Sequence, residues 1–309
     1  MDVLQRLAET DWTVRLTQLG VHQPDRAPLL DLVEQVRHRP DDVARVQHLA
    51  DTVLLPYIGD YLGVFAEDRP SFGPDDADHP LMRGALPLVA LLVTADDVHE
   101  AHRRRGIPAD TSWRSLSDLG QQVAKTREVE GRTGSHNQNW LRNVWADGYL
   151  WLGRLQLEVQ RSQLGNDDAE PVPVINVHIP DDGPLPPEAV DDAFRRAARE
   201  MPRYYPELRD AEHLMCQSWL LDPQLQQLAP GSNVAAFQER WRLWKTEPRD
   251  RDGYYFVFDI EPEKGRDLPY GIDALPVRSG LQQALVDLWR RGGHVQMGYG
   301  AVPLAPYRD

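Results

Sequence analysis

One stretch of the sequence, from Val172 to Leu221, limits the possible folds more than any other. It opens with an apolar run that predicts a buried strand: Val174, Ile175, Val177 and Ile179. A turn ending at Gly183 follows, and Pro186-Pro187 then marks the start of a helix. A second strand is expected from Leu214 to Leu221. The order strand, helix, strand predicts a layer of helix packed on a sheet.

The helix expected after Pro187 is strongly amphipathic. Its apolar face is formed by residues at helical spacing: Ala189, Val190, Ala193, Phe194, Ala197, Ala198 and Met201. Its opposite face carries Arg195, Arg196 and Arg199. A helix of this kind is stabilised by burying one side, so it should cover the sheet that the flanking strands belong to.

The first part of the chain has a different pattern, in which apolar residues recur at helical spacing and strand signals are absent. Helices are expected on both sides of Pro40, at 88–104 and at 117–130, with a loop over 69–80. Small and polar turn formers at 131–137 then interrupt the periodicity. We therefore predict a helical domain over residues 1–135 and a mixed-sheet domain over residues 136–309.

The second domain contains further strand and helix patterns. Strands are expected at 152–160 and 254–260. The glycine-containing run that begins at Gln296 is followed by two prolines within five residues rather than by a helical pattern, which predicts a strand or a turn there. Ser232 or Asn233 should cap a helix whose apolar stripe is Val234, Phe237, Trp241 and Trp244. The whole chain is thus expected to be α/β (α+β), with a helical N-terminal domain followed by a mixed sheet.

Composition narrows the function classes. Acidic residues outnumber basic ones 48 to 34, and the net charge of −14 argues against nucleic acid and anionic membranes as partners. A single cysteine, Cys216, rules out an internal disulfide and any CxxC motif, which is typical of a reducing compartment. The acidic N-terminus and the shortness of the longest apolar run, 85–93, predict a cytoplasmic protein. His99 and His102 have the wrong spacing for a zinc-protease helix, so no metal is expected.

Two polar residues interrupt the apolar strand near its carboxyl end. Asn176 and His178 are two positions apart and therefore share one face of the strand. Open α/β sheets bind ligands at this edge, and a neutral imidazole can accept a proton from an attacking amine. The alternative is a structural histidine that is hydrogen-bonded to a neighbour.

Other residues of the sequence are weaker candidates for binding a ligand. The helix start after Gly183 can offer backbone amides to a pyrophosphate, although Asp181 and Asp182 would repel one, and a surface turn is the alternative. Ser218 and Asn233 can position an amine or a thioester, or else serve as core and cap residues. The tryptophans at 140, 145 and 151 can line an acyl channel or pack in a core.

Several segments occur in an order that resembles a known family: 151–158, 177–180, 183–185, 216–221 and 231–237. They resemble the C-terminal domain of bacterial GNAT-like N-acyltransferases, a group that includes the lipoglycopeptide N-acyltransferases. The similarity is clear over residues 140–260, and the helical region before it looks like the N-terminal domain of the same family. It implies transfer of an acyl group from acyl-CoA to a small-molecule amine, without a metal.

The resemblance also implies roles for particular residues. His178 would be the general base, with Asn176 beside it on the strand. The acyl-CoA would be bound by residues of the strand end, the following loop and the next strand and helix: Ile179, Gly183, Leu185, Ser218, Trp219 and Asn233. Two alternatives remain at this point, a non-catalytic acyl-CoA or small-molecule binding protein on the same fold and an interaction protein with an acidic surface.

Overall fold

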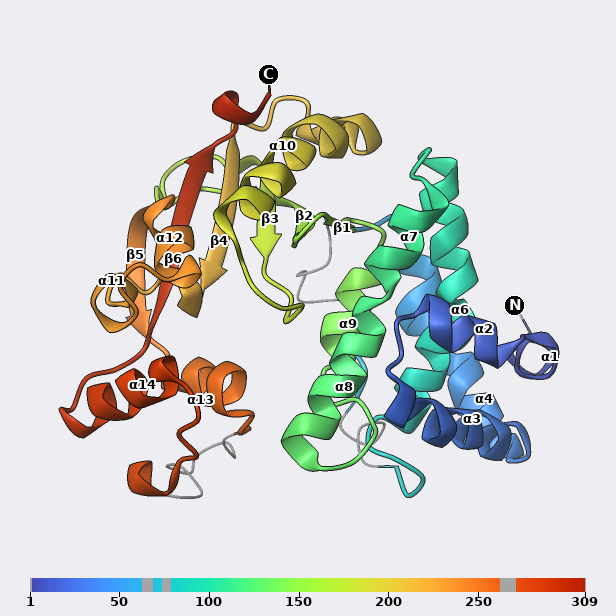
Figure 1. The fold of residues 1–309 in the computed structure, drawn as a ribbon. Coiled ribbons are helices and arrows are strands. Elements are labelled where there is room, and N and C mark those ends of the chain that lie inside the picture. Colours follow the sequence, from blue (N-terminus) through green and yellow to red (C-terminus); the bar gives the residue numbers. More distant parts are fainter. Residues whose placement is uncertain (1, 63–68, 74–78, 262–270, 309) are drawn as a thin grey trace. The chain divides into compact units, whose positions relative to one another are not determined.

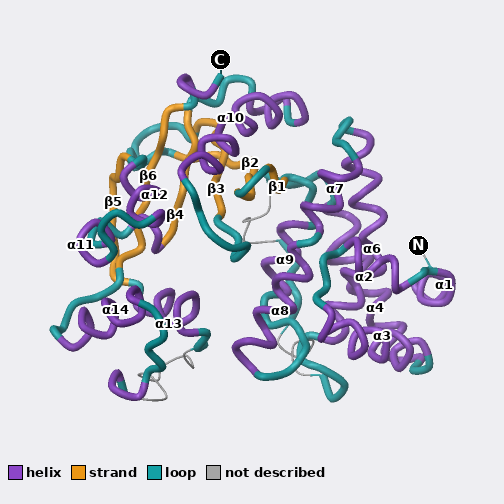
Figure 2. The backbone as a smooth tube through the Cα atoms, in the orientation of Figure 1, coloured by secondary structure: helices purple, strands orange, loops and turns teal. Residues whose placement is uncertain are grey.

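The computed structural model describes residues 2–62, 69–73, 79–261 and 271–308. These residues form two compact units, Met1–Trp151 and Leu152–Asp309. Helices make up the first unit, and a sheet with flanking helices makes up the second (Figures 1 and 2). The helical N-terminal region and the mixed-sheet region predicted from the sequence are therefore both confirmed. The placement of the domain boundary after residue 135 stays a prediction.

Eight α-helices are described in the first unit: α1 (Val3–Glu9), α2 (Trp12–Gln18), α3 (Gln23–Arg37), α4 (Pro40–Leu49), α6 (Ala85–Arg104), α7 (Ala109–Leu116), α8 (Asp118–Glu130) and α9 (Gln138–Val144). The expected helices on both sides of Pro40, at 88–104 and at 117–130 are present, whereas α1, α2, α7 and α9 were not individually predicted. Part of the predicted loop 69–80, residues 74–78, lies outside the described residues. In the described ranges, none of the helices combines the length and the apolar composition needed to cross a bilayer.

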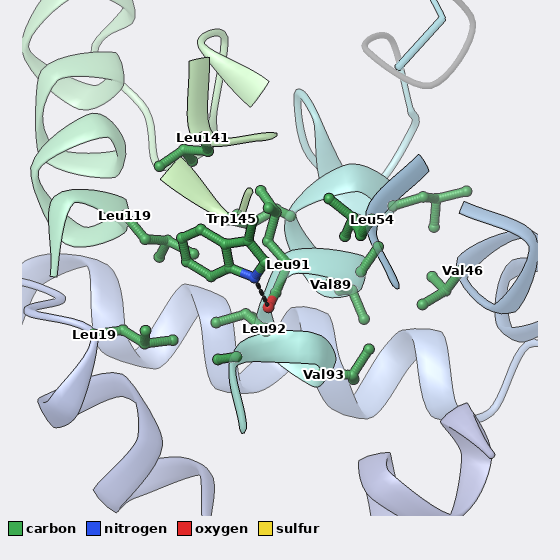
Figure 3. Packing of buried hydrophobic residues seen from close by; sticks show 14 of the residues in the cluster. Leu19, Val46, Leu54, Val89, Leu91, Leu92, Val93, Leu119, Leu141 and Trp145 are labelled. Carbon is green, nitrogen blue, oxygen red and sulfur yellow. Dashed lines mark hydrogen bonds between the residues drawn. The ribbon is translucent and has the colours of Figure 1, made fainter. Parts of the chain in front are cut away.

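Helix α6 is the centre of this unit's core. Its residues from Ala85 to Ala95 are all buried, and they pack with apolar side chains of the surrounding helices. Trp145, which follows α9, is 1% exposed and donates from its indole Nε1 to the carbonyl oxygen of Leu91 at 3.2 Å (Figure 3). Of the alternatives for this tryptophan, core packing is the one observed.

Two histidines of α6, His99 and His102, lie beside the hydroxyl of Ser112. Both Nδ1 atoms lie within hydrogen-bond distance of the Ser112 hydroxyl oxygen, His99 at 2.7 Å and His102 at 2.8 Å. Nε2 of His102 is 3.2 Å from the Asp147 carboxylate, and both side chains are buried. Burial lowers the pKa of His102 to about 3 and raises the pKa of Asp147 to about 6. The cluster therefore holds a neutral histidine at neutral pH.

Helix α8 approaches the turn after α2 so closely that only glycine fits at their contact. A Cβ atom at Gly120 would lie 2.2 Å from the carbonyl carbon and oxygen of Gly20, and the Gly120 amide donates to Leu19 at 3.0 Å. We expect Gly120→Ala to destabilise the protein by roughly 1–3 kcal/mol through overpacking, measured by urea unfolding. Gly280→Ala is the control, because a Cβ atom there meets nothing within 4 Å; an equal loss in both variants would contradict the prediction.

The described residues form a sheet of six strands in the order β1-β2-β3-β4-β6-β5, of which β2 to β6 lie in the second unit. The strands are β1 (Tyr149–Leu152), β2 (Leu155–Ser162), β3 (Val172–His178), β4 (His213–Ser218), β5 (Arg242–Pro248) and β6 (Gln296–Pro303). The α-helices of the second unit are α10 (Pro187–Tyr204), α11 (Leu225–Leu228), α12 (Asn233–Glu239), α13 (Asp250–Phe258) and α14 (Gly280–Arg290). Strand β3 is antiparallel to β2 and parallel to β4, with α10 as the connection between β3 and β4. The strand, helix, strand order predicted for 172–221 is thus confirmed.

Helix α10 packs against β2 and α12 through its predicted apolar face. Six of the seven predicted residues are buried: Val190, Ala193, Phe194, Ala197, Ala198 and Met201. Phe194 meets the ring of Trp241 edge-on, with centroids 5.9 Å apart. The core side of the sheet is formed by alternating strand residues, including Leu157, Ile175 and Cys216.

Three predicted elements have different limits in the structure. The strand expected at 152–160 is divided into β1 and β2 by a turn in which Gly153 has a φ of 65°, and β4 ends at Ser218, after which Trp219–Leu221 forms a 3-10 turn. The helix predicted through Trp244 ends at Glu239, because the following residues pair with β6 as strand β5.

The strand predicted at 254–260 is wrong, because Asp250–Phe258 is helix α13. A short apolar and aromatic run is compatible with either a buried strand or a buried helix face. Two acidic residues in the first turn, Asp250 and Asp252, favour the helix. Packing decides the outcome, since Tyr254 and Phe258 contact Trp289 of α14 in a small apolar cluster.

Candidate functional site

A cluster of three polar side chains lies where β2 and β3 pair. Nε2 of His178 is 2.9 Å from Oε2 of Glu158, and the Asn176 amide nitrogen donates to the same oxygen at 3.0 Å. The Asn176 nitrogen is also 3.1 Å from Nε2 of His178. The predicted pair of Asn176 and His178 is therefore brought together, and a carboxylate is added to it.

The strand register explains this arrangement. Antiparallel pairing sets Glu158 opposite Asn176, and Gln156 opposite His178. Cross-strand partners share a face, so the four polar side chains gather on one side of the sheet while Leu157 and Val177 point to the other. The side chain of His178 is 23% exposed, whereas that of Glu158 is 5% exposed. The imidazole is thus the more accessible member of the acid–imidazole pair.

Glu158 was missed by the reasoning from sequence. The signal was nevertheless present, because polar residues alternate with apolar ones from Leu155 to Gln160. The sequence did not show which strand pairs with this one or in which register. Without the β2–β3 register, no side chain of β2 could be predicted to lie beside His178.

Strand β4 continues the same face. The parallel pairing with β3 is limited to two residue pairs, Ile175 with Leu214 and Asn176 with Met215. By alternation, Met215 and Gln217 lie on the side of His178, while Cys216 and Ser218 lie on the side of Val177. The Ser218 hydroxyl accepts the backbone N–H of Leu220 at 3.1 Å. The register therefore does not bring Ser218 beside His178.

Trp219 and Asn233 lie on separate elements. Trp219 begins the 3-10 turn after β4 and packs against the apolar cluster of α13 and α14. Asn233 is the exposed first residue of α12, and the cap of this helix is Ser232, whose hydroxyl accepts the N–H of Ala235 at 3.1 Å. The capping alternative is confirmed for Ser232.

The loop after His178 is organised by an arginine that sequence reasoning also missed. Arg154, from the β1–β2 turn, donates to three carbonyl oxygens of this loop: Pro180 at 2.9 Å, Gly183 at 2.7 Å and Pro184 at 2.8 Å. Gly183 adopts a φ of 81°, a left-handed conformation that glycine permits. Ile179 is half-buried and Leu185 is buried. The loop is therefore held in a defined conformation next to the cluster.

Proline limits the number of amides that this loop can offer to an anion. Positions 180, 184, 186 and 187 are prolines and have no N–H, and the N–H of Asp182 is bonded to Pro180 at 2.9 Å. The amide of Ala189 is bonded to Pro186 at 3.0 Å. Few backbone donors at the start of α10 are thus available to a phosphate.

A second polar group lies on the His178 side of the sheet, on strands β4, β5 and β6. The Tyr299 hydroxyl donates to Glu247 at 2.6 Å and accepts from the Gln217 amide at 3.0 Å. Lys245 is 2.7 Å from Glu247. Hydrogen bonds from Lys245 and Tyr299 lower the pKa of Glu247 to about 2, and burial followed by the bond to Glu247 raises the pKa of Tyr299. Of these groups, Lys245, Glu247 and Tyr299 were not anticipated from the sequence.

Cys216 is not available for nucleophilic chemistry. It is fully buried on the core side of β4, and burial raises the pKa of its thiol well above the usual range. A buried thiol that stays protonated is a poor nucleophile. Cys216 is therefore not expected to attack a thioester.

Two protein-family models together match most of the chain. Residues 11–146 match the N-acyltransferase N-terminal domain, and residues 149–302 match the GNAT-like C-terminal domain. A comparison with curated proteins gave no match.

Three crystal structures of acyltransferases are similar over most of the chain. An acyltransferase in complex with decanoyl-CoA is 29% identical, with a TM-score of 0.76, covering 93% of this chain and 85% of the other. One in complex with CoA and 10C-teicoplanin and one with decanoyl-CoA and teicoplanin are each 26% identical, with TM-scores of 0.78 and 0.79 and coverage of 97% and 93%. The chain thus belongs to the two-domain N-acyltransferases, in which a helical N-terminal domain precedes a GNAT-like C-terminal domain.

Proposed function

We propose that this protein transfers an acyl group from acyl-CoA to an amine of a small-molecule acceptor, with His178 as the general base. The observation that carries the proposal is the partly exposed imidazole of His178, hydrogen-bonded to Glu158 at the carboxyl end of β3. Both matched domains and the three similar acyltransferases support the reaction class.

The reaction needs one proton to be moved. A neutral amine attacks the thioester carbonyl carbon, so that a C–N bond forms and the nitrogen becomes an ammonium. His178 accepts a proton from this ammonium, the C–S bond then breaks, and the CoA thiolate takes the proton back from the imidazolium. The products are an amide and CoA, and no covalent enzyme intermediate is required.

The donor is expected beside β3 and the loop from Ile179 to Leu185. Strands β3 and β4 pair over two residues only, so the end of β3 retains backbone groups that an extended pantetheine chain can bond. The loop has few free amides and carries two acidic residues, Asp181 and Asp182. We therefore attribute most of the donor affinity to pantetheine and the acyl tail, with Trp219 and Asn233 in binding roles.

For the acceptor we propose an amino sugar, because two of the similar acyltransferases are bound to teicoplanin or its 10C derivative. The net charge of −14 would attract a cationic acceptor before it loses its proton. A non-catalytic binding protein on the same fold would bind acyl-CoA without product formation.

A melting series with CoA, acetyl-, octanoyl- and decanoyl-CoA tests donor binding. At a hundredfold excess over Kd, a ligand that binds only the native state raises stability by about 2.7 kcal/mol, so Tm should rise by a few degrees. We expect octanoyl- and decanoyl-CoA to give larger shifts than CoA, because each buried methylene contributes about 0.8 kcal/mol. Absence of any shift at millimolar ligand would contradict the proposal.

The same ligands with a panel of amino sugars and glycopeptides test turnover. Release of CoA thiol together with the mass of the acylated amine is the expected result. A melting shift without product from any amine would instead favour the non-catalytic alternative.

A further inference from the structure

We infer that Glu158 is a positioning residue, which holds His178 in the tautomer with the proton on Nε2 and thereby makes Nδ1 the basic nitrogen. This inference rests on the proposed function. The Glu158 carboxylate oxygen lies 2.9 Å from Nε2 of His178, a distance typical of a charge-assisted hydrogen bond.

The Asn176 amide nitrogen lies 3.1 Å from Nε2 of His178, but the shorter contact of Nε2, at 2.9 Å, is to the carboxylate, and it favours one protonation pattern. An ionised carboxylate only accepts hydrogen bonds, and the same Glu158 oxygen already receives the Asn176 amide at 3.0 Å. If Nε2 of His178 carried its lone pair instead, that lone pair would face the carboxylate oxygen. With Nε2 protonated, both neighbours donate to Glu158, and the lone pair of the imidazole is on Nδ1.

The surroundings make the carboxylate effective. Its side chain is 5% exposed, so water screens it little, and Glu158 and Asn176 are fixed opposite each other by the β2–β3 register. The imidazole reaches solvent with 23% of its side-chain surface. The charged partner is thus buried and held by the sheet, while the group that meets the substrate is accessible.

This pairing also affects the proton transfer. When Nδ1 of His178 takes the proton released by the attacking amine, the ring becomes an imidazolium whose Nε2–H already points at Glu158. The positive charge forms next to a buried negative one, without reorientation of either side chain. When the C–S bond breaks, the same proton passes from Nδ1 to the CoA thiolate, and the ring returns to its starting tautomer.

Glu158→Gln tests the role kinetically in the full-length protein. The substitution keeps the size of the side chain and removes its charge, and the new amide can donate to Nε2 and favour the wrong tautomer. We expect kcat to fall about 10²- to 10⁴-fold, as when the orienting acid of a catalytic triad is neutralised, with KM and the decanoyl-CoA melting shift unchanged. Glu170→Gln, an exposed acid of the same unit, is the matched control and should retain full activity.

Imidazole ¹⁵N NMR of histidine-labelled protein gives a readout that does not depend on turnover. The His178 signals, assigned by their loss in His178→Gln, should show a protonated Nε2 in the wild type and a shift toward protonated Nδ1 in Glu158→Gln. A wild-type ring protonated on Nδ1, or an unchanged kcat in Glu158→Gln, would overturn the inference. If the wild type acylates no amine yet shows the expected tautomer, the proposed function fails while the link between Glu158 and His178 stands.

Discussion

Replacing His178 with alanine should lower kcat/KM for acyl transfer by about 10²- to 10⁴-fold, while the protein still folds and binds acyl-CoA. A positioned general base contributes a rate factor of this size, which corresponds to about 3–5 kcal/mol of transition-state stabilisation. The imidazole is partly exposed and contacts Glu158 of β2 and Asn176 of β3. The apolar side chains of β3 that form the core point to the opposite side of the sheet. Removal of the imidazole therefore leaves the apolar core of the sheet intact. Steady-state kinetics with decanoyl-CoA and an accepted amine measures the effect.

His48→Ala provides the matched control, since this histidine is exposed on α4 of the helical unit and has no part in the proposed site. Circular dichroism and thermal melts separate the two roles of His178. Loss of folding in His178→Ala would favour a structural histidine, and full activity would remove His178 from catalysis. At high pH a larger fraction of amine is neutral, so a partial recovery of rate there would be consistent with loss of a base.

Parts of the fold that depend on local periodicity were predictable from the sequence. Helix α10 has an apolar face with a consistent helical spacing and begins at paired prolines, so both its type and its buried side followed from the residues. That Asn176 and His178 point to the same side of the sheet was also predictable, because side chains two positions apart in a strand share a face. These features require no knowledge of what the element packs against.

Other parts depend on pairing and packing that no single segment encodes. Glu158 joins His178 only because β2 pairs with β3 in one register, and Tyr299 joins Glu247 only because β6 pairs with β5. The helix of 250–258 is selected by contact with Trp289, which lies well beyond it along the chain. Such long-range contacts decide ambiguous apolar runs, which is why the strand predicted there was wrong.

Replacing Trp145 with alanine should destabilise the protein by about 3–5 kcal/mol, the usual cost of deleting a large buried aromatic side chain. Its indole is 1% exposed in the core of the first unit, close to Leu91, Leu92, Leu119 and Leu141 (Figure 3). The substitution leaves a cavity that close-packed helices fill only in part, and it also removes the hydrogen bond to the Leu91 carbonyl. Urea unfolding followed by circular dichroism measures the loss.

Trp145→Phe separates the two contributions, because phenylalanine keeps most of the apolar volume and lacks the indole N–H. We expect this variant to lose less than half as much stability as Trp145→Ala, since a net hydrogen bond contributes about 1 kcal/mol. The competing idea, that Trp145 lines an acyl channel, gives the opposite pattern. In that case Trp145→Ala would keep its stability and shift the preferred donor from decanoyl-CoA to longer acyl chains, because the channel would gain the volume of the indole. Stability loss without a change in chain-length preference is therefore the result expected of a core residue.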